Sequence, residues 1–195
     1  MRSLVLASRS ANRMRILRRE GVEFEAIEAL FDDAAEAPEG VVEQNAMRIA
    51  QLKAQSVVET FAPRCAGKFI LAADTICEMD GHAVGKPRSR LEAASMMELA
   101  FRGAHRVVTG VCIVWEHRQW TFFDQAHVTI EAVGQEILHN YIESDLWQGR
   151  AGGYDIGERM ADGWRLHCDG DLDTVAGLPW RRVKEFILQI EKECQ

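Results

Sequence analysis

The sequence predicts an α/β fold built on a mixed sheet, and two observations lead to this prediction. The apolar runs at residues 3–7 and 69–73 are short and uninterrupted, as in strands that are buried on both faces. Between the expected strands lie segments in which apolar residues recur at helical spacing. With 195 residues, 47% of them hydrophobic and 27% charged, the chain has the composition of a globular protein with a substantial core. We therefore expect residues 1–195 to form a single domain.

The first third of the chain is expected to form a strand, a helix, a second strand and a long helix. After the strand at residues 3–7, Ser10 is a suitable N-cap and Gly21 stands where a helix C-terminal glycine belongs. Residues 22–29 alternate loosely between apolar and polar, which predicts the second strand. Apolar residues at helical spacing predict a long amphipathic helix over residues 38–61.

The second apolar run is followed by a hairpin signal. We expect its strand to end at Asp74. Residues 76–79 and 82–85 then flank Asp80-Gly81, a dipeptide typical of two-residue hairpin turns.

The second half of the chain is predicted to continue this alternation. Ser89-x-x-Glu92 matches a capping box and predicts a helix that ends near Phe101. The remaining expected elements are strands at residues 106–115, 120–131 and 164–168, and helices at 134–143 and 179–193, the last with proline in its first turn.

Charge and composition exclude several classes of protein. A net charge of −7 argues against binding to polymeric nucleic acid, which requires a broad basic face. No apolar stretch approaches the ~20 residues that span a bilayer, and the run Leu4–Ala7 is too short for a secretory signal. The five cysteines are scattered without a C-x-x-C motif, which is typical of reduced, packed thiols. We expect a cytoplasmic protein without membrane contact.

The opening segment is a candidate anion site. Six arginines and no acidic residue precede Glu20, although the whole chain is acidic. The segment "SRSANR" is expected at a strand-to-helix turn, where free backbone N–H groups and the positive helix end favour anions. We interpret Ser8 and Arg13 as ligand contacts. The later arginines are interpreted as a solvated helix face: Arg15, Arg18 and Arg19.

Asp74 is the candidate catalytic carboxylate. It follows a buried-type strand, where α/β proteins place functional residues and where an unpaired charge would be unfavourable. The hairpin would bring Lys86 back towards it. The alternative, an ordinary surface Asp–Lys pair, would contribute little stability.

Other charged residues support simpler interpretations. By composition alone Lys53 is an ordinary helix lysine. The acids of "FDDAAEAPE" are compatible with a metal site or a solvated loop, and the solvated loop is the simpler interpretation. Three histidines without partners at ligand spacing are expected in the core or on the surface: His105, His127 and His167. The sequence contains no Walker loop, G-x-G-x-x-G motif or nucleophile elbow.

Seven short motifs follow one another from Leu4 to Pro179, and each of them is weak by itself. In order they are "LASRSANR", "RIAQLKA", "AADT", "GKP", "HRVVTGV", "AGGYDI" and "GDLDTVAGLP". Together they resemble the Maf family of nucleoside triphosphate pyrophosphatases, which has an inosine-triphosphatase-like fold. The resemblance implies a strongly twisted sheet with a cleft between two lobes, and a homodimer. It also implies hydrolysis of a nucleoside triphosphate to the monophosphate and pyrophosphate with Mg²⁺ or Mn²⁺.

The resemblance also implies roles for particular residues. The family's catalytic acid, which accepts a proton from the attacking water, falls on Asp74. Its other site residues fall on Ser8 and Arg13, on the phosphate-side lysines Lys53 and Lys86, and on Asp33, a metal contact together with Asp74. Arg13, Lys53 and Lys86 would neutralise phosphate oxygens.

The base-selecting positions depart from the family pattern. Asn12 stands where the dTTP/UTP subgroup has an arginine, although Thr75 fits that subgroup. The motif "AYGIQG" becomes "GYDIGE", so the expected glutamine falls on Gly157, beside Glu158. A guanine-type base edge could donate hydrogen bonds to Glu158. The preferred base therefore stays open between dTTP or UTP, 7-methyl-GTP and other nucleotides.

Two alternatives to an enzyme stay open at this point. One is a catalytically weak, nucleotide-binding regulatory protein linked to cell division; the other is a nucleic-acid-binding module linked to septation. The presence of Asp74, Lys53 and Lys86 favours the enzyme, because a protein that only binds nucleotides does not need the acid. The expected exposed aromatics Trp115, Trp120 and Trp147 do not by themselves establish the homodimer.

Overall fold

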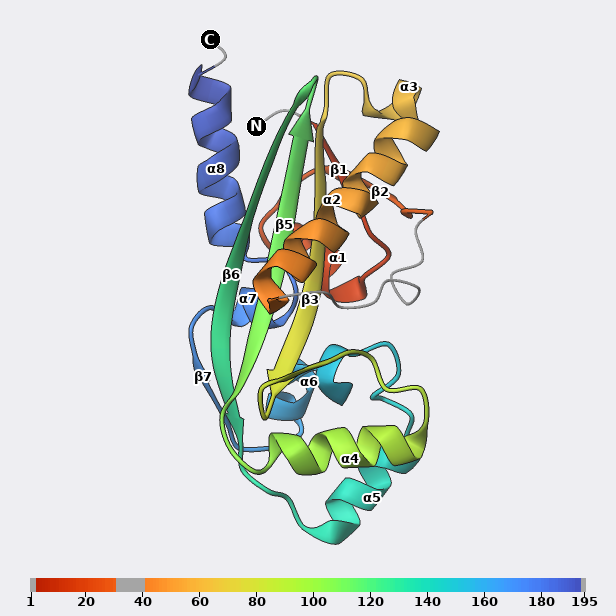
Figure 1. Cartoon of the computed structure of the whole chain (residues 1–195), viewed down its shortest axis with the longest axis vertical. Coiled ribbons are helices and arrows are strands. Elements are labelled where there is room, and N and C mark those ends of the chain that lie inside the picture. The colour runs from red at the N-terminus through yellow and green to blue at the C-terminus, as the bar shows by residue number, and fades with distance from the viewer. Residues whose placement is uncertain (1–2, 31–40, 194–195) are drawn as a thin grey trace. The chain divides into compact units, whose positions relative to one another are not determined.

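A computed structural model describes residues 3–30 and 41–193 (Figure 1). In this part of the chain a seven-stranded sheet has the order β2-β1-β3-β5-β6-β7, and β4 pairs with β3. Strand β1 is parallel to β2 and β3, whereas β4 and β7 are antiparallel to their partners. The predicted mixed sheet flanked by helices is confirmed.

The predicted helices and strands occur along the chain in the predicted order. The strands are β1 (Leu4–Ala7), β2 (Phe24–Ile27), β3 (Phe69–Met79), β4 (His82–Val84), β5 (His105–Trp115), β6 (Arg118–Ile130) and β7 (Leu166–Asp169). The helices are α1 (Ala11–Arg19), α2 (Val42–Thr60), α3 (Ala62–Cys65), α4 (Arg90–Ala100), α5 (Gln135–Glu143), α6 (Ile156–Ala161), α7 (Leu172–Val175) and α8 (Trp180–Glu193), with a 3-10 helix η2 (Ala151–Gly153). None of the described helices has the length and apolarity required to cross a membrane.

The chain divides into two compact units, each assembled from separate segments. The first unit contains the chain up to Asp74, Thr109–Asp124, and the part from Gly177 onward; the second contains Thr75–Val108 and Gln125–Ala176. Strands β3, β5 and β6 each supply residues to both units. That the whole chain acts as a single domain stays a prediction.

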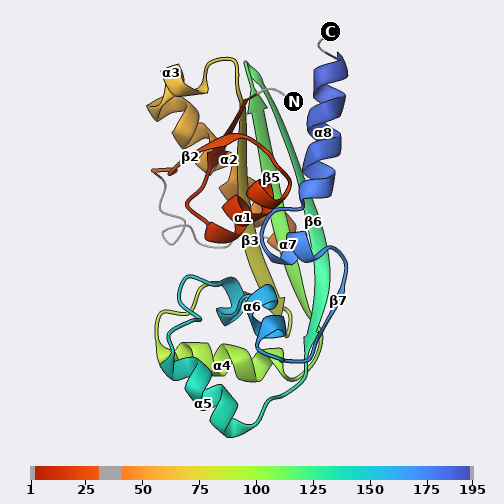
Figure 2. The ribbon, with the colours of Figure 1, turned by 180° about the vertical axis from the view of Figure 1, so that it is seen from behind.

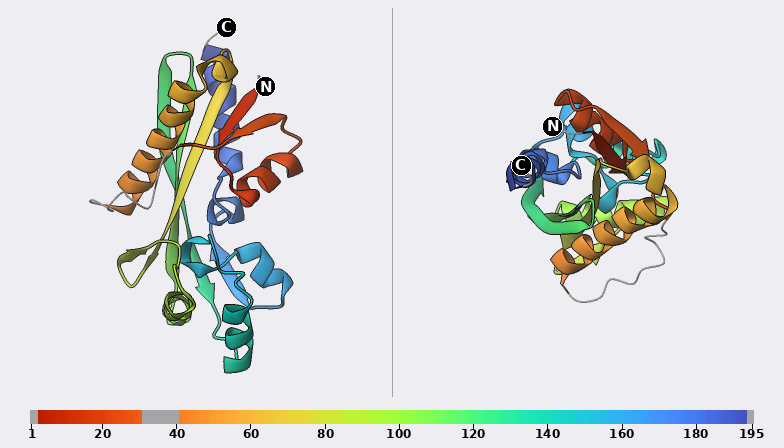
Figure 3. Two further views of the ribbon diagram at one scale, coloured as in Figure 1. Left: turned by 90° about the vertical axis from the view of Figure 1, so that its right-hand side faces the viewer. Right: turned by 90° about the horizontal axis from the view of Figure 1, so that it is seen from above.

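In the first unit, β1 lies between β2 and the first part of β3. Leu4 is in register with Phe24 on one side and with Phe69 on the other, and all four residues of β1 are buried, as its apolar run predicts. Helices α1 and α2 cover opposite faces of these strands (Figure 3). Helix α2 approaches β5 so closely that a Cβ atom at Gly110 would lie 2.2 Å from the backbone carbon of Ala46. Only glycine fits at this crossing.

Helix α8 packs against the first-unit part of β6 (Figure 2). The rings of Phe122 and Phe186 stack with their centroids 5.0 Å apart. On β5, Trp115 packs against Phe69 at 5.5 Å and is buried, so the expectation that Trp115 is exposed is wrong. The ring is buried because it packs against a ring of the neighbouring strand β3 and does not face the surface.

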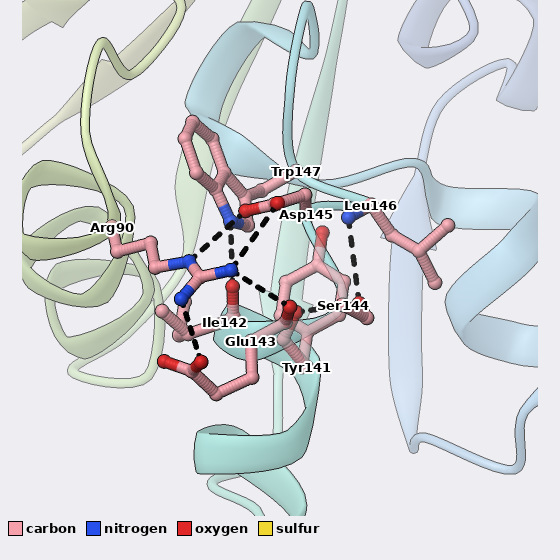
Figure 4. Close-up of polar contacts among 8 residues, drawn as sticks. All are labelled: Arg90, Tyr141, Ile142, Glu143, Ser144, Asp145, Leu146 and Trp147. Carbon is pink, nitrogen blue, oxygen red and sulfur yellow. Dashed lines mark hydrogen bonds and ion pairs between the residues drawn. The ribbon is translucent and has the colours of Figure 1, made fainter.

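The second unit surrounds its own apolar core, which includes Cys77 and Met79 of β3 and Met97 of α4. Trp147 also belongs to this core, and its indole N–H donates to the carbonyl of Ile142 at 2.9 Å; the expectation that Trp147 is exposed is therefore wrong. On the surface of the unit, Arg90 at the start of α4 is bound by residues at the end of α5 (Figure 4).

Local signals placed several element ends correctly. Ser10 caps α1 by accepting from the backbone N–H of Arg13, and Gly21 follows the helix with φ of 67°. Ser89 caps α4 by accepting from the N–H of Glu92 at 3.2 Å. The Glu92 carboxylate reaches back to the N–H of Arg88 at 2.8 Å, one residue before the expected partner.

Candidate active site

The turn from β1 to α1 is built around Arg13. This side chain is buried, and its NH1 group donates to Ser8 Oγ at 3.1 Å. Its Nε–H donates to the backbone carbonyl oxygen of Gly177 at 2.7 Å. The contact brings the motif "LASRSANR" together with "GDLDTVAGLP", although Arg13 and Gly177 are 164 residues apart in the sequence. Arg13 is therefore fixed in place by protein contacts on both sides of its guanidinium.

The three later arginines of this segment behave differently. Arg15, Arg18 and Arg19 are exposed on α1, as predicted for a solvated helix face. Asn12 is half-buried in the first turn of the same helix.

A second contact joins Lys53 of α2 to Asp74 of β3. Lys53 Nζ lies 2.7 Å from Asp74 Oδ1, and the two side chains are only 12% and 11% exposed. A carboxylate this far from water requires a charged or hydrogen-bonding partner, and Lys53 supplies it. The pair unites the motifs "RIAQLKA" and "AADT". Lys53 is thus not an ordinary solvated helix lysine.

The position of Asp74 differs from the prediction in one respect. Asp74 lies inside β3 and not at its end, because the strand continues to Met79. The continuation is stabilised by β4, whose pairing with β3 begins at Cys77, whereas the pairing with β1 ends at Leu71. Asp74 therefore lies between the two paired stretches of this edge of β3.

The register of β1 on β3 relates the two contacts. Leu6 is opposite Leu71, and the strands are parallel, so two further residues along each strand bring Ser8 level with Ala73. Ser8 follows the end of β1, and Asp74 lies inside the neighbouring strand β3, one residue beyond the level of Ser8. The end of a strand such as β1 is where α/β proteins assemble ligand sites. Four of the predicted site residues meet in two pairs in the first unit.

Four other predicted site residues lie in the second unit. Thr75 is half-buried on β3, and Lys86 is exposed just after β4. Gly157 and Glu158 lie on α6, a six-residue helix that the sequence did not predict. Glu158 is half-buried and its Oε1 atom accepts from Arg150 NH2 at 2.7 Å. Whether Glu158 contacts a base stays a prediction.

Sequence reasoning missed Arg150 and Asp155, which together organise the start of α6. Asp155 is buried, and its Oδ1 caps the helix by accepting from the N–H of Glu158 at 2.9 Å. Its Oδ2 lies 3.4 Å from Arg150 NH1. The only sequence signal was a change of charge: Asp155 and Glu158 stand where the family motif "AYGIQG" has glycine, and Gly157 stands where it has glutamine.

Two buried tyrosines lie near the start of α6, one bonded to a glycine and the other to a histidine. The Tyr141 hydroxyl donates to the Gly153 carbonyl oxygen at 2.6 Å, and burial raises the pKa of Tyr141 to about 12. The Tyr154 hydroxyl lies 2.6 Å from His105 Nε2. Burial lowers the pKa of His105 to about 4, so this histidine is neutral at pH 7 and belongs to the core, in agreement with the sequence interpretation.

The donor set can be tested against the expected divalent cation. Asp33, a predicted metal contact, lies outside the described residues. Residues 3–30 and 41–193 contain no group of three or more His, Cys, Asp or Glu side chains that could hold a metal ion. A cation that is carried largely by substrate phosphates and water needs only one or two protein carboxylates. Asp74 is one such carboxylate, so the described residues fit a cation of that kind.

Comparison with known proteins covers almost the whole chain. The family model described as "Maf-like protein" matches residues 3–190. The dTTP/UTP pyrophosphatase of Acholeplasma laidlawii (strain PG-8A) is 32% identical over 184 residues, 93% of this chain and 93% of the relative. The dTTP/UTP pyrophosphatase of Bacillus anthracis (strain CDC 684 / NRRL 3495) is 31% identical over 197 residues, 97% of this chain and 98% of the relative.

Among solved structures, the Ham1 protein of Staphylococcus aureus matches 66% of this chain and 71% of its own, with 14% identity and a TM-score of 0.44. A TM-score this low carries no argument about common ancestry or function. The family model matches residues 3–190, almost the whole chain, and this match shows that the chain belongs to the Maf family.

Proposed function

We propose that this chain is a nucleoside triphosphate pyrophosphatase, which hydrolyses a nucleoside triphosphate to the monophosphate and pyrophosphate. The observation that carries the proposal is the contact between Lys53 Nζ and Asp74 Oδ1 at 2.7 Å, where two charges are largely withdrawn from water beside the end of β1. Family membership and relatives that are named dTTP/UTP pyrophosphatases support it. The same proposal includes a homodimer, implied by the family resemblance, and a cytoplasmic location, expected from the composition and the scattered cysteines.

In this proposal Asp74 is the general base. Its carboxylate takes the proton from a water molecule while the water oxygen attacks the α-phosphorus and pyrophosphate leaves. Lys53 fixes the direction of the Asp74 carboxylate through the Oδ1 contact. An ammonium group has three N–H donors, so the same lysine can contact a phosphate oxygen as well as the carboxylate.

The remaining cations act on the phosphates. Arg13 is positioned by Ser8 and Gly177, and a guanidinium fixed in this way stabilises phosphate charge without having to be ordered when substrate binds. Lys86 is the second phosphate-side lysine. Asp74 and Asp33 are the carboxylates that would hold Mg²⁺ or Mn²⁺, and the cation would supply neutralisation of the phosphate oxygens.

Base preference is assigned to four positions: Asn12, Thr75, Gly157 and Glu158. Thr75 agrees with the subgroup to which the named relatives belong, whereas Asn12 and Gly157 depart from it. The ion pair with Arg150 holds the Glu158 carboxylate on the surface of α6. We therefore expect a base preference that differs from that of the dTTP/UTP pyrophosphatases.

One assay tests the proposal. The purified full chain is incubated with standard, methylated and deaminated nucleoside triphosphates and with Mg²⁺ or Mn²⁺, and the products are separated by chromatography. We expect a monophosphate and pyrophosphate from at least one nucleotide. In water enriched in heavy oxygen, attack at the α-phosphorus places the label in the monophosphate. Label in pyrophosphate, or release of diphosphate and phosphate, would show a different reaction. No product from any nucleotide with either cation would favour the regulatory, nucleotide-binding alternative.

A further inference from the structure

Gly152 in the second unit is tightly enclosed and is bonded to the residue before Lys86. Its N–H donates to the carbonyl oxygen of Gly85 at 2.9 Å. Its φ is 70°, and an added Cβ atom would lie 2.9 Å from Cys77 Sγ and 3.1 Å from Met79 Cε. Any side chain at this position would therefore have to displace either the β3 side chains or the backbone at Gly85.

The next residue, Gly153, lies beside the residue that follows Lys86. An added Cβ atom at Gly153 would be in ordinary contact with Pro87 Cγ, at 3.7 Å, and Pro87 is buried. The Gly153 carbonyl oxygen is in turn held by the hydroxyl of Tyr141 at 2.6 Å. Tyr141 is 3% exposed, so this hydrogen bond is protected from water.

These contacts fix the backbone on both sides of Lys86. The side chain itself is exposed, but the Gly85 carbonyl before it is bonded to Gly152 and Pro87 after it packs beside Gly153. A lysine side chain has large rotamer entropy, so an anchored backbone reduces what must be ordered when the ammonium meets an anion. Displacement of a binding group by about 1 Å can lower a rate by about 10²-fold.

We propose that Gly152 and Tyr141 are positioning residues for Lys86: they hold the loop Gly85–Pro87 so that the ammonium is presented to the phosphates of the substrate. This inference rests on the proposed function, in which Lys86 contacts phosphate. It adds two residues that touch neither substrate nor cation but set the geometry of one that does.

The first test compares Gly152→Ala with Gly149→Ala. Both glycines have a left-handed backbone, with φ of 70° and 72°, so the two substitutions bring comparable backbone strain. A Cβ atom at Gly149 meets no atom within 4 Å. We expect Gly152→Ala to lower kcat/KM by about 10-fold to 100-fold, and Gly149→Ala to change it by less than about 3-fold. Equal losses in the two variants would overturn the proposal.

The second test separates positioning from general damage and remains informative if Gly152→Ala does not fold. Tyr141→Phe removes one hydroxyl and leaves the ring in the core. We expect it to lower kcat/KM by about 3-fold to 10-fold in the wild-type background, and by less than about 2-fold when Lys86→Met is already present. Losses that multiply in the double variant would show that Tyr141 acts independently of Lys86 and would overturn the proposal, as would an unaffected Lys86→Met variant.

Failure of the proposed function can be told apart from failure of this inference. If the wild-type chain hydrolyses no nucleotide, the same double-variant cycle is measured on the Kd of a nucleoside triphosphate by calorimetry, with the same expectation of non-additivity. A chain that neither hydrolyses nor binds a nucleotide overturns both. Hydrolysis with an additive cycle overturns the positioning role alone.

Discussion

Two groups of oppositely charged side chains have similar chemistry but differ in burial. They are Lys53 with Asp74 in the first unit, and Arg90 with Glu143 and Asp145 in the second. Lys53 makes one contact with its carboxylate, and both side chains are nearly buried. Arg90 donates to Glu143 at 2.6 Å, to both carboxylate oxygens of Asp145 and to the backbone carbonyl of Glu143, yet it is about half exposed (Figure 4). An arginine with several acceptors is therefore half exposed to water, whereas the Lys53–Asp74 contact is largely withdrawn from it.

The difference indicates what each group is for. The Arg90 network joins the start of α4 to the end of α5, and exposed ion pairs of this kind contribute between about 0 and 1 kcal/mol each. Withdrawing Lys53 and Asp74 from water is unfavourable by itself and is only partly offset by their attraction. An arrangement that sacrifices stability in this way is typical of a functional site, whereas the exposed network is typical of a structural tie.

The largest expected effect comes from Asp74→Asn. The amide has nearly the same shape but cannot accept a proton from water, so we expect kcat for monophosphate formation to fall by at least ~10³-fold while the circular dichroism spectrum stays that of the folded wild type. Glu143→Gln, the same chemical change in the exposed network, is the matched control and should leave kcat unchanged within about 2-fold. A near wild-type turnover of Asp74→Asn would remove Asp74 from the mechanism.

An intermediate effect is expected for Lys53→Met, which leaves the Asp74 carboxylate buried without its cation. We expect the free energy of unfolding to fall by about 1–3 kcal/mol, measured by urea titration at pH 7, and kcat/KM to fall by about 10²-fold.

Arg90→Met removes a cation that binds several acceptors but remains in water. The expected loss of stability is below about 1 kcal/mol, without a change in kcat/KM. If Arg90→Met destabilised the chain more than Lys53→Met, burial would not determine how much a pair contributes to stability, and the comparison would fail.

The smallest effect concerns acid. The hydrogen bond from Arg90 lowers the pKa of Asp145 below its ordinary value of 3.8. A lowered pKa in the folded state means that the unfolded chain binds the proton first, so the stabilisation is present above about pH 4 and is lost as the pH falls through the lowered pKa. The difference in urea midpoint between wild type and Asp145→Asn should be constant from pH 7 to about 4 and should then shrink. A difference that persists unchanged into stronger acid would contradict this assignment. Asn tolerates the left-handed backbone of Asp145, whose φ is 58°.

Local sequence signals predicted local structure well. Asp80 and Gly81 have φ values of 49° and 75°, as a two-residue hairpin turn requires, and the serine caps of α1 and α4 were placed correctly. The helices α3, α6 and α7 have only four to six residues, too few for apolar periodicity to appear. The hairpin of residues 76–79 and 82–85 was predicted, but the end of β3 was misplaced because the first hairpin strand continues the apolar run through Asp74 without a break.

The candidate site shows the same division between local and distant information. Nothing in the spacing of Lys53 and Asp74 announces a contact; only the motif resemblance assigned both to one site. The acceptor of Arg13 is a backbone carbonyl, and a carbonyl has no sequence signal at all. The glycines of "AGGYDI" were visible as part of a motif, but the reason for Gly152, the close approach of Cys77, required coordinates.

The hydrogen bond from Arg13 to Gly177 has a consequence for biosynthesis. Residue 13 leaves the ribosome early, but its carbonyl acceptor is synthesised only after nine tenths of the polypeptide has been translated. Until then the nascent chain carries an arginine without its native acceptor, and the segment after β1 cannot adopt its final geometry. A truncated translation product that ends before Gly177 would accordingly be released without this acceptor, so that only longer molecules acquire the complete arrangement around Arg13.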